Sequence, residues 1–264
     1  MAPLLTLGAL KDPSMADAIL ECVELTKYFG ALAAVNRISF AVERGEIFGI
    51  TGPNGAGKTT LFNLLSGHAP VSNGLIRFEH KEIQHLPPHH ICRLGLARTF
   101  QIPHVFTGMT VAENVLVGSC FGSNARYLVL SIDREARARA EAALAVTGLL
   151  DKAEWPAHLL SVYERKLLMI ASALAMNPRV LLLDEPFGGL NHLQIGELMN
   201  LIRKIHERGV TILLIEHVMS ALMRLSGRVM VMHHGEKLLE GSPEQIMSDA
   251  RVIEVYLGRK IDLP

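Results

Sequence analysis

Residues 52–59 have the chemistry that says most about this chain. They read Gly-Pro-Asn-Gly-Ala-Gly-Lys-Thr and fit the pattern G-x-x-x-x-G-K-[ST]. Glycines at these positions let backbone N–H groups turn toward a β-phosphate, Lys58 supplies a cation, and the Thr59 hydroxyl suits Mg²⁺. The pattern predicts a phosphate-binding loop, whose residues are Gly52, Pro53, Asn54, Gly55, Ala56, Gly57, Lys58, Thr59 and Thr60.

The residues on either side of the loop have the patterns that such a loop requires. Residues 46–51 are an apolar run typical of a buried strand, and residues 59–65 are typical of a helix that Gly67 closes. A strand–loop–helix order places the positive end of a helix dipole under the bound anion. The flanks therefore favour phosphate binding over a glycine-rich turn with an incidental lysine.

A second chemical feature is the acidic pair Asp184-Glu185, which follows the apolar strand pattern of residues 180–183. A carboxylate at a strand tip can hold Mg²⁺, and its neighbour can polarise a water for in-line attack on a γ-phosphate. Such a pair is by itself equally compatible with a solvated strand end. In a chain that also has a phosphate loop, we assign Asp184 to the metal and Glu185 to catalysis.

The composition narrows the class of protein. The chain has 264 residues, enough for one large domain or for two lobes that share a core, and 49% of them are hydrophobic. Lys and Arg number 26, as do Asp and Glu, so no net charge favours a nucleic acid or an anionic membrane. Cys22, Cys92 and Cys120 lack metal-binding spacing and indicate a reducing, cytoplasmic setting.

The sequence predicts neither a membrane span nor a signal peptide. No apolar run approaches the roughly 18–20 residues of a spanning helix. The apolar patch of residues 3–10 precedes the first charge, Lys11, which is the reverse of the order in a signal peptide. We expect residues 1–18 to be a disordered leader, with Met15 as an alternative start, and residues 19–264 to form one domain.

The order of the strand and helix patterns indicates how these groups are positioned. Alternating strands and helices predict a mainly parallel sheet, with ligands at the carboxyl ends of its strands. Residues 103–176 are mostly helical in pattern and predict a helical lobe inserted in the α/β core. Strands are expected at residues 19–25, 37–42, 46–51, 75–78, 180–183, 210–215, 228–232 and 237–240. Helices are expected at residues 59–65, 133–147, 161–176 and 192–208, and from Ser242 onward.

Taken together, these features resemble the ATPases of the ATP-binding-cassette (ABC) family, over residues 19–258. The resemblance implies a P-loop NTPase fold with a mainly parallel sheet, an antiparallel β subdomain and the inserted helical lobe. It also implies ATP and Mg²⁺ as cofactors, and an Mg-dependent ATPase activity coupled to transmembrane transport.

The resemblance assigns further residues by their order along the chain. Gln101 lies where the family has its Q-loop glutamine, which senses Mg²⁺ and joins the core to the helical lobe. His217 matches the switch histidine that contacts the γ-phosphate, and Phe29 lies where an aromatic ring stacks on adenine. The catalytic assignments are Glu185, His217 and Gln101, and the metal assignments are Thr59, Gln101 and Asp184.

One segment departs from the family pattern. The family hydrolyses nucleotide between two cassettes, where the phosphate loop of one faces an LSGGQ-type signature of the other. Residues 160–166 keep Ser161, which we assign to nucleotide binding, but Val162 and Tyr163 replace both glycines and Glu164 stands where Gln is expected. These side chains would obstruct a phosphate, and Glu164 would itself satisfy the helix dipole. We expect a catalytically weak signature; the alternative is that the change is tolerated and only slows turnover.

Three stretches, residues 95–101, 108–115 and 252–258, resemble the ATPases of branched-chain amino-acid importers. We therefore expect an ATP-hydrolysing subunit that energises import of branched-chain or related hydrophobic amino acids. Its expected partners are transmembrane permease subunits, a second ABC ATPase in a homodimer or heterodimer and, indirectly, a substrate-binding protein, but no nucleic acid. It would dock peripherally at the cytoplasmic face of the inner (plasma) membrane, through a groove near residues 101–114.

Other functions are left open by the sequence. One is an ABC ATPase for another small solute, or for lipid export. A second is a weakly hydrolysing, nucleotide-gated subunit, suggested by the degenerate signature. A third is a soluble ABC ATPase that acts on nucleic acid or ribosomes, against which the neutral charge and the lack of a second cassette argue.

Overall fold

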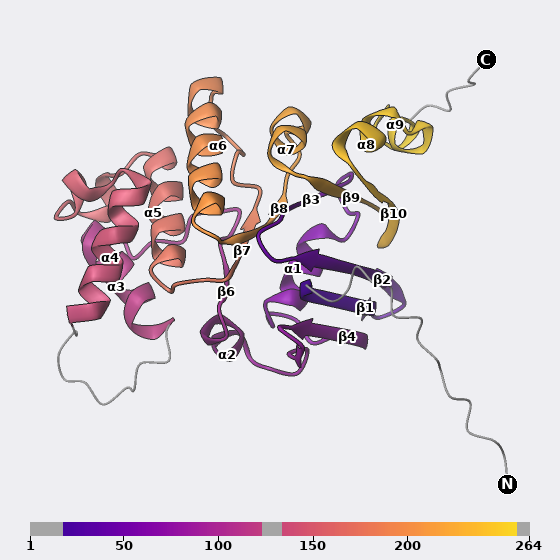
Figure 1. Cartoon of the computed structure of the whole chain (residues 1–264), viewed down its shortest axis with the longest axis horizontal. Coiled ribbons are helices and arrows are strands. Elements are labelled where there is room, and N and C mark those ends of the chain that lie inside the picture. The colour runs from indigo at the N-terminus through magenta and orange to yellow at the C-terminus, as the bar shows by residue number, and fades with distance from the viewer. Residues whose placement is uncertain (1–17, 123–133, 258–264) are drawn as a thin grey trace, which may run out of the picture.

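The computed structural model describes residues 18–122 and 134–257 (Figure 1). The expected leader, residues 1–18, lies outside these ranges except for Ala18, and the expected helix 133–147 loses only its first residue. The expected domain, residues 19–264, is described except for residues 123–133 and 258–264.

A parallel sheet supplies the frame of the molecule. Its strands are β10 (Glu236–Gly241), β9 (Arg228–His233), β3 (Ile47–Thr51), β8 (Thr211–Ile215), β7 (Val180–Asp184) and β6 (Leu96–Arg98), in that spatial order. Neighbours from β9 to β6 run parallel, and β10 is antiparallel to β9. The mainly parallel sheet is therefore confirmed, and β3, β7 and β8 end at one edge because they share a direction.

A second, antiparallel sheet has the order β2-β1-β4-β5, with β1 (Ala18–Phe29), β2 (Leu32–Glu43), β4 (Asn73–Phe78) and β5 (Lys81–Glu82). Strands β1 and β2 are longer than the sequence predicted. Glu24 has φ 49° and Arg37 has φ 48°, and the register of the pair shifts between Cys22 and Leu25. The prediction stopped at these irregularities because a bulge interrupts the alternation of side chains that marks a strand.

Helices cover both sheets. The long ones are α3 (Val111–Phe121), α4 (Arg134–Thr147), α5 (Val162–Leu174) and α6 (His192–Glu207). The shorter ones are α1 (Lys58–Leu65), α2 (Pro88–Arg93), α7 (Met219–Leu225), α8 (Pro243–Ser248) and α9 (Ala250–Leu257). The sequence predicted α1, α4, α5, α6 and α8, but not α2, α7 or α9, because two turns give too little hydrophobic periodicity to recognise. Helices α3, α4 and α5 pack together at the end of the molecule opposite the antiparallel sheet (Figure 1).

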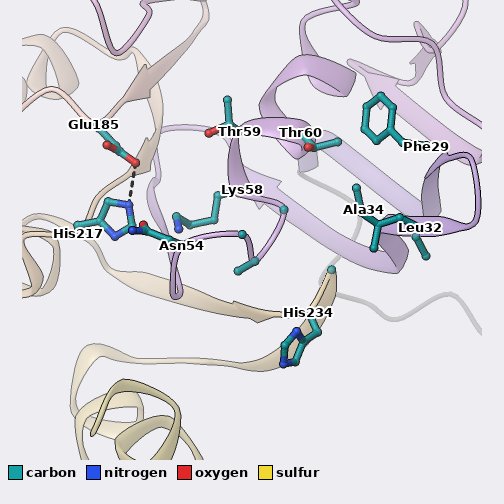
Figure 2. Close-up of a pocket in the computed structure, with 15 residues that line it drawn as sticks. Phe29, Leu32, Ala34, Asn54, Lys58, Thr59, Thr60, Glu185, His217 and His234 are labelled. Carbon is teal, nitrogen blue, oxygen red and sulfur yellow. Dashed lines mark ion pairs between the residues drawn. The ribbon is translucent and has the colours of Figure 1, made fainter. Parts of the chain in front are cut away.

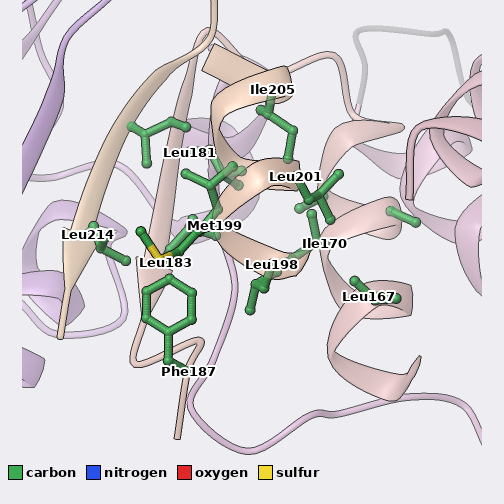
Figure 3. Packing of buried hydrophobic residues seen from close by; sticks show 14 of the residues in the cluster. Leu167, Ile170, Leu181, Leu183, Phe187, Leu198, Met199, Leu201, Ile205 and Leu214 are labelled. Atoms are coloured by element: carbon green, nitrogen blue, oxygen red, sulfur yellow. The ribbon is translucent and has the colours of Figure 1, made fainter. Parts of the chain in front are cut away.

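Two apolar clusters bury both faces of the parallel sheet. Along β7, Leu181 and Leu183 belong to the cluster formed with α5 and α6, whereas Val180 and Leu182 belong to the cluster formed with α1 and the antiparallel sheet. Figure 3 shows the first cluster, in which Leu181 and Leu183 face side chains of α6. Covering on both faces explains why these strands read as unbroken apolar runs.

Candidate nucleotide site

The phosphate loop follows β3, and two of its glycines occupy positions that exclude any side chain. Gly52 has φ 147° and Gly57 has φ 95°, conformations that L side chains rarely adopt. A Cβ on Gly52 would lie 2.1 Å from the Met232 carbonyl oxygen, and a Cβ on Gly57 would lie 2.2 Å from the Ala34 carbonyl oxygen. Bare backbone is therefore required where the loop passes β9 and β2.

The Lys58 ammonium lies within this loop. Its Nζ donates hydrogen bonds to the carbonyl oxygens of Gly52 (2.7 Å) and Pro53 (3.0 Å). Burial lowers the pKa of Lys58, while the charges of Glu185 and Asp184 act in the opposite direction. Both oxygens that the ammonium contacts are neutral, so a phosphate oxygen would be the stronger, charge-assisted acceptor.

Helix α1 presents its positive end to the same loop. Gly57 is its N-cap and makes no side-chain capping bond. The first N–H groups of a helix lack intrahelical partners, and the helix dipole adds partial positive charge there. Thr59 and Thr60 bring hydroxyl groups to this end, on the wall of a cavity (Figure 2). This arrangement has the donors and the charge that a phosphate requires.

Residues from three distant parts of the chain meet at the end of β7. Glu185 Oε1 forms an ion pair with His217 Nε2 at 2.8 Å (Figure 2). Gln101 Nε2 donates a hydrogen bond to Glu185 Oε2 at 2.5 Å. The preceding residue, Asp184, is buried, and Arg98 Nη2 donates to its Oδ2 at 2.8 Å. The structure thus brings together the three residues that the sequence assigned to catalysis.

A buried carboxylate that the sequence reasoning missed holds these loops in place. Glu216 Oε1 accepts a hydrogen bond from the Phe187 N–H (2.8 Å), and its Oε2 accepts from the N–H groups of His217 (2.9 Å) and Val218 (3.1 Å). Burial raises the pKa of Glu216, and these three N–H groups act in the opposite direction. The available signal was an acidic residue directly after an apolar strand, the same signal that identified Asp184.

A cavity of about 470 Å³ joins the phosphate loop to the antiparallel sheet. Phe29, the last residue of β1, lies on its wall and is 54% exposed, with Lys27 Nζ 5.1 Å from the ring centroid. The wall also includes Leu32, Ala34 and His234, which the sequence did not assign (Figure 2). A half-exposed aromatic ring beside a cavity of this size can stack on a nucleobase.

Ser161 does not line this cavity. It is the N-cap of α5. Its Oγ accepts a hydrogen bond from the Glu164 N–H (3.2 Å), and its own N–H donates to Glu164 Oε2 (2.8 Å). Glu164 also pairs with Lys152. Of the two residues that replace the glycines, Val162 is exposed and Tyr163 packs against the apolar cluster beneath α5 and α6. The structure does not bring Ser161 to the phosphate loop of the same chain.

The residues assigned to a metal have chemistry that suits Mg²⁺. Thr59, Asp184 and Gln101 can present hydroxyl, carboxylate and amide oxygens, and Mg²⁺ prefers oxygen ligands. Within residues 18–122 and 134–257, no group of three or more His, Cys, Asp or Glu side chains could hold a metal. A site that offers only a few protein ligands still suits Mg²⁺, because this ion usually keeps several waters and also binds substrate phosphates.

Comparisons of the sequence with known proteins find two family models and a set of full-length relatives. The ABC transporter model matches residues 35–188, and the branched-chain amino acid ATP-binding cassette transporter model matches residues 236–262. The chain is 41% identical to the high-affinity branched-chain amino acid transport ATP-binding protein BraF of Pseudomonas aeruginosa, over 92% of this chain and 99% of BraF. It is 38% identical to the high-affinity branched-chain amino acid transport ATP-binding protein LivG of Salmonella typhimurium, over 92% of this chain and 99% of LivG. It is 36% identical to the lipopolysaccharide export system ATP-binding protein LptB of Acidithiobacillus ferridurans, over 93% of this chain and 99% of LptB.

Solved structures give the same picture of the fold. The ADP conformation of an ATP-binding cassette of an ABC transporter has a TM-score of 0.83 and 31% identity, and covers 92% of this chain and 99% of its own. A dimeric bacterial ABC transporter cassette has a TM-score of 0.75 and 25% identity, and the match covers 85% of this chain and 98% of that cassette. In the described part of this chain, no helix has the length and apolar content needed to cross a bilayer.

Proposed function

Because this chain belongs to the ABC transporter family of ATP-binding cassettes, we propose that it is the ATP-hydrolysing subunit of an importer for branched-chain amino acids. The observation that supports ATP hydrolysis most directly is the meeting of Glu185, His217 and Gln101 beside the phosphate loop. The substrate class comes from BraF and LivG, whose whole length this chain matches and whose names specify branched-chain amino acid transport. Related hydrophobic amino acids are included in the proposal.

The residues of the cavity would divide the work of binding and cleavage. Phe29 would stack on the adenine, the phosphate loop would donate its N–H groups to the phosphates, and Lys58 would neutralise the β- and γ-phosphates. Glu185 would take a proton from a water as that water's oxygen bonds to the γ-phosphorus and the bond to the bridging oxygen of ADP breaks. His217 and Gln101, which hold the two Glu185 oxygens, would orient this base and report the γ-phosphate.

A Mg²⁺ ion bound with ATP would neutralise charge that develops on the phosphate oxygens. Thr59 and Asp184 are the residues that we assign to holding it, with Gln101 as a further oxygen ligand. In the arrangement observed, the amide nitrogen of Gln101 donates a hydrogen bond to Glu185. The amide oxygen of the same group is its metal-binding atom, so one side chain would link the base to the metal.

A second cassette would complete the site. We place Ser161 and the start of α5 against the nucleotide of a partner cassette, since Ser161 lies outside the cavity of its own chain. The exposed Val162 at that helix start, and the self-capping Glu164, support the proposal that this chain's own signature is weak. A different partner with an intact signature would keep one active site, built on this chain's Lys58 and Glu185.

A groove beside the segment of residues 104–106 is our proposed docking place for a permease subunit. It has a volume of about 340 Å³ and lies between that segment and helices α3 and α5. Its lining includes His104, Phe106, Asn114 and Phe121, and both aromatic rings are more than half exposed. Apolar side chains exposed around a groove suit a helical segment of another protein. Docking there would place the chain at the cytoplasmic face of the membrane. A substrate-binding protein would be an indirect partner, and no nucleic acid is included among the proposed partners.

The transport proposal is tested by deleting the gene and measuring uptake of radiolabelled leucine, isoleucine and valine. Uptake should fall to background and return with the wild-type chain but not with Lys58→Ala. Lys81→Ala, which changes an exposed lysine of β5, is the control and should restore uptake. Unchanged amino-acid uptake accompanied by a defect in lipid export would contradict the proposal and support the alternative suggested by LptB. Loss of uptake of another solute alone would show that the substrate class is wrong.

A further inference from the structure

A buried guanidinium lies directly behind the acidic pair. Arg98 is the last residue of β6, and its side chain is 4% exposed. Its Nη2 donates to Asp184 Oδ2 at 2.8 Å, and its Nη1 donates to Asn63 Oδ1 at 2.8 Å and to Ser66 Oγ at 3.0 Å. One side chain therefore joins the tip of β7 to α1, the helix that begins at the phosphate loop.

Aromatic rings fix the orientation of this guanidinium. Its central carbon lies 5.7 Å from the ring centroid of Phe62 and 4.9 Å from that of Phe100. The His68 ring packs edge-on against Phe100, with centroids 5.4 Å apart, and its Nδ1 is hydrogen-bonded to Ser66 Oγ at 2.9 Å. A planar fork that is stacked and hydrogen-bonded on two edges has little freedom to rotate, so the Asp184 oxygen that it holds is fixed as well.

Stability alone does not explain this arrangement. A buried ion pair gains little over well-packed apolar side chains of similar volume, because both charges lose their hydration. Arg98 Nε is also buried and has no hydrogen-bond partner among the described residues, which is a further cost. The cost is understandable if the carboxylate at the far end of the pair must keep one orientation for another purpose.

Asp184 is the residue whose orientation matters for the metal. Burial raises the pKa of Asp184, and the hydrogen bond and the charge of Arg98 act in the opposite direction. Without Arg98, this buried carboxylate would have the charges of Glu185 and Lys58 nearby, but no other cation of residues 18–122 and 134–257 forms an ion pair with it. With Arg98 on Oδ2, the second oxygen, Oδ1, is presented in a fixed direction to a metal ion or to its bound water.

We propose that Arg98 is a positioning residue that holds the Asp184 carboxylate ready for the metal ion of the nucleotide site. The role rests on the proposed ATPase function and adds to it a residue that does not touch the nucleotide itself. Partners of metal ligands orient those ligands, and their loss typically lowers metal affinity about 10–100-fold. Arg98 should therefore matter for the nucleotide complex with Mg²⁺ and not for the nucleotide alone.

The test compares the affinity of the purified full-length chain for a non-hydrolysable ATP analogue with Mg²⁺ and with EDTA. The ratio of the two affinities is the gain due to the metal. In Arg98→Gln this gain should fall by about tenfold or more, while the affinity in EDTA stays at the wild-type value. Arg98→Lys keeps the charge but not the fork, so its loss should be smaller; it also serves as the second variant if the Gln variant does not fold.

Arg228 provides a matched control. Its guanidinium likewise lies over a phenylalanine, 5.0 Å from the Phe48 centroid, and pairs with Glu46 and Glu240 away from the cavity. Arg228→Gln should lower stability without changing the gain due to Mg²⁺. If folded Arg98 variants keep the wild-type gain, the role of Arg98 is overturned while the ATPase function stands. If the wild-type chain binds no nucleotide, the proposed function fails and this role fails with it.

Discussion

At Glu185 the backbone and the side chain are both constrained. The residue has φ 48°, a left-handed conformation that costs a non-glycine residue about 1–3 kcal/mol. Its two carboxylate oxygens are engaged separately, one by His217 and the other by Gln101. Strain of this kind persists where surrounding contacts over-determine the conformation, and it is often found at sites of chemistry. The geometry supports the assignment of Glu185 as the base.

Glu185→Gln removes the ability to accept a proton and keeps the shape of the side chain. ATP turnover should fall by about 10²–10⁴-fold, the range typical of a lost general base. ATP binding should persist, because the phosphate loop and Lys58 are unchanged. Phosphate release and equilibrium nucleotide binding measure the two effects. Glu207→Gln, at the end of α6, is the control and should leave both unchanged; hydrolysis that survives in Glu185→Gln would remove Glu185 from its role.

The sequence predicts a site residue well when its neighbours along the chain identify it. Lys58 stands in a loop pattern of fixed spacing, and Glu185 follows an unbroken apolar strand. Glu216 also follows an apolar strand and was overlooked, whereas Arg98 lacks such neighbours. Arg98 is 86 residues from Asp184 along the chain, and its role becomes visible only when β6 pairs with β7. Contacts between adjacent strands of a sheet cannot be read from one sequence, so the role of Arg98 was missed.

At the scale of elements, the start of α5 decides whether this chain can serve a partner's nucleotide. Replacing Val162 and Tyr163 together by glycine would clear the helix start but cost about 1 kcal/mol of stability at each position. It would also remove the Tyr163 hydroxyl, whose pKa is raised to about 12 by burial and by its hydrogen bond to Glu197. If the signature is obstructed, turnover by the purified chain should rise by about tenfold, because N–H donors become accessible to a γ-phosphate.

The matched variant replaces both residues by alanine. Alanine restores good helix propensity and keeps a Cβ at each position, so it should not raise turnover. The measurement is the steady-state ATPase rate of the wild-type chain, the double glycine variant and the double alanine variant. Each rate is measured at increasing protein concentration, because the composite site needs two cassettes. Turnover of the wild-type chain at the rate of an ordinary homodimeric cassette, or an equal rise in both variants, would show that the signature is not obstructed.

The charge of Glu164, at the start of α5, makes the stability of the fold depend on pH. The hydrogen bond from Lys152 lowers the pKa of Glu164 from 4.5 to about 2. A carboxylate with a depressed folded-state pKa stabilises the fold above its unfolded pKa, and this contribution is lost as pH falls from about 5 to about 2. Because the pair is partly exposed, we expect about 1–2 kcal/mol and not the full value of the shift.

Glu164→Gln isolates this charge, because glutamine can still complete the capping box with Ser161. Urea unfolding should show the variant less stable than wild type at pH 7, with the difference shrinking as the pH approaches 2. Glu113→Gln changes the equivalent capping residue of α3, which has no ion pair within the described residues, and it serves as the control. A difference between Glu164→Gln and wild type that is independent of pH would contradict the assignment.

Elements were predictable to the extent that they were long and regular. Helix α6 was expected at residues 192–208 and found at His192–Glu207, because its apolar stripe and its end signals agree. Helices α2 and α7 have six and seven residues and were missed. Strand β6 was also missed, because its three residues are recognisable as a strand only through their pairing with β7. Local sequence pattern thus identified the long, regular elements, whereas the short ones are defined by contacts with distant parts of the chain.

At the scale of the whole molecule, helix α9 contacts the end of β3, the strand that leads into the phosphate loop. Tyr256 in α9 is hydrogen-bonded through its hydroxyl to Thr51 Oγ1 at 2.6 Å and to the backbone of Gly52. Thr51 Oγ1 in turn donates to the carbonyl oxygen of Glu216 at 3.0 Å. The end of the described chain therefore supports both the strand that precedes the phosphate loop and the segment that holds His217.

Tyr256→Phe removes these hydrogen bonds and keeps the ring. Stability should fall by about 0.5–1.5 kcal/mol, the usual contribution of a hydrogen bond, as measured by urea unfolding. Hydrogen exchange should quicken at residues 51–57 and 216–218 while α3 and α4 keep their protection, because opening would be local to the supported segments. Tyr28→Phe, at an exposed tyrosine of β1, should change neither quantity. Exchange that quickens everywhere would mean that α9 stabilises the fold as a whole, and unchanged exchange would mean that it does not support the phosphate loop.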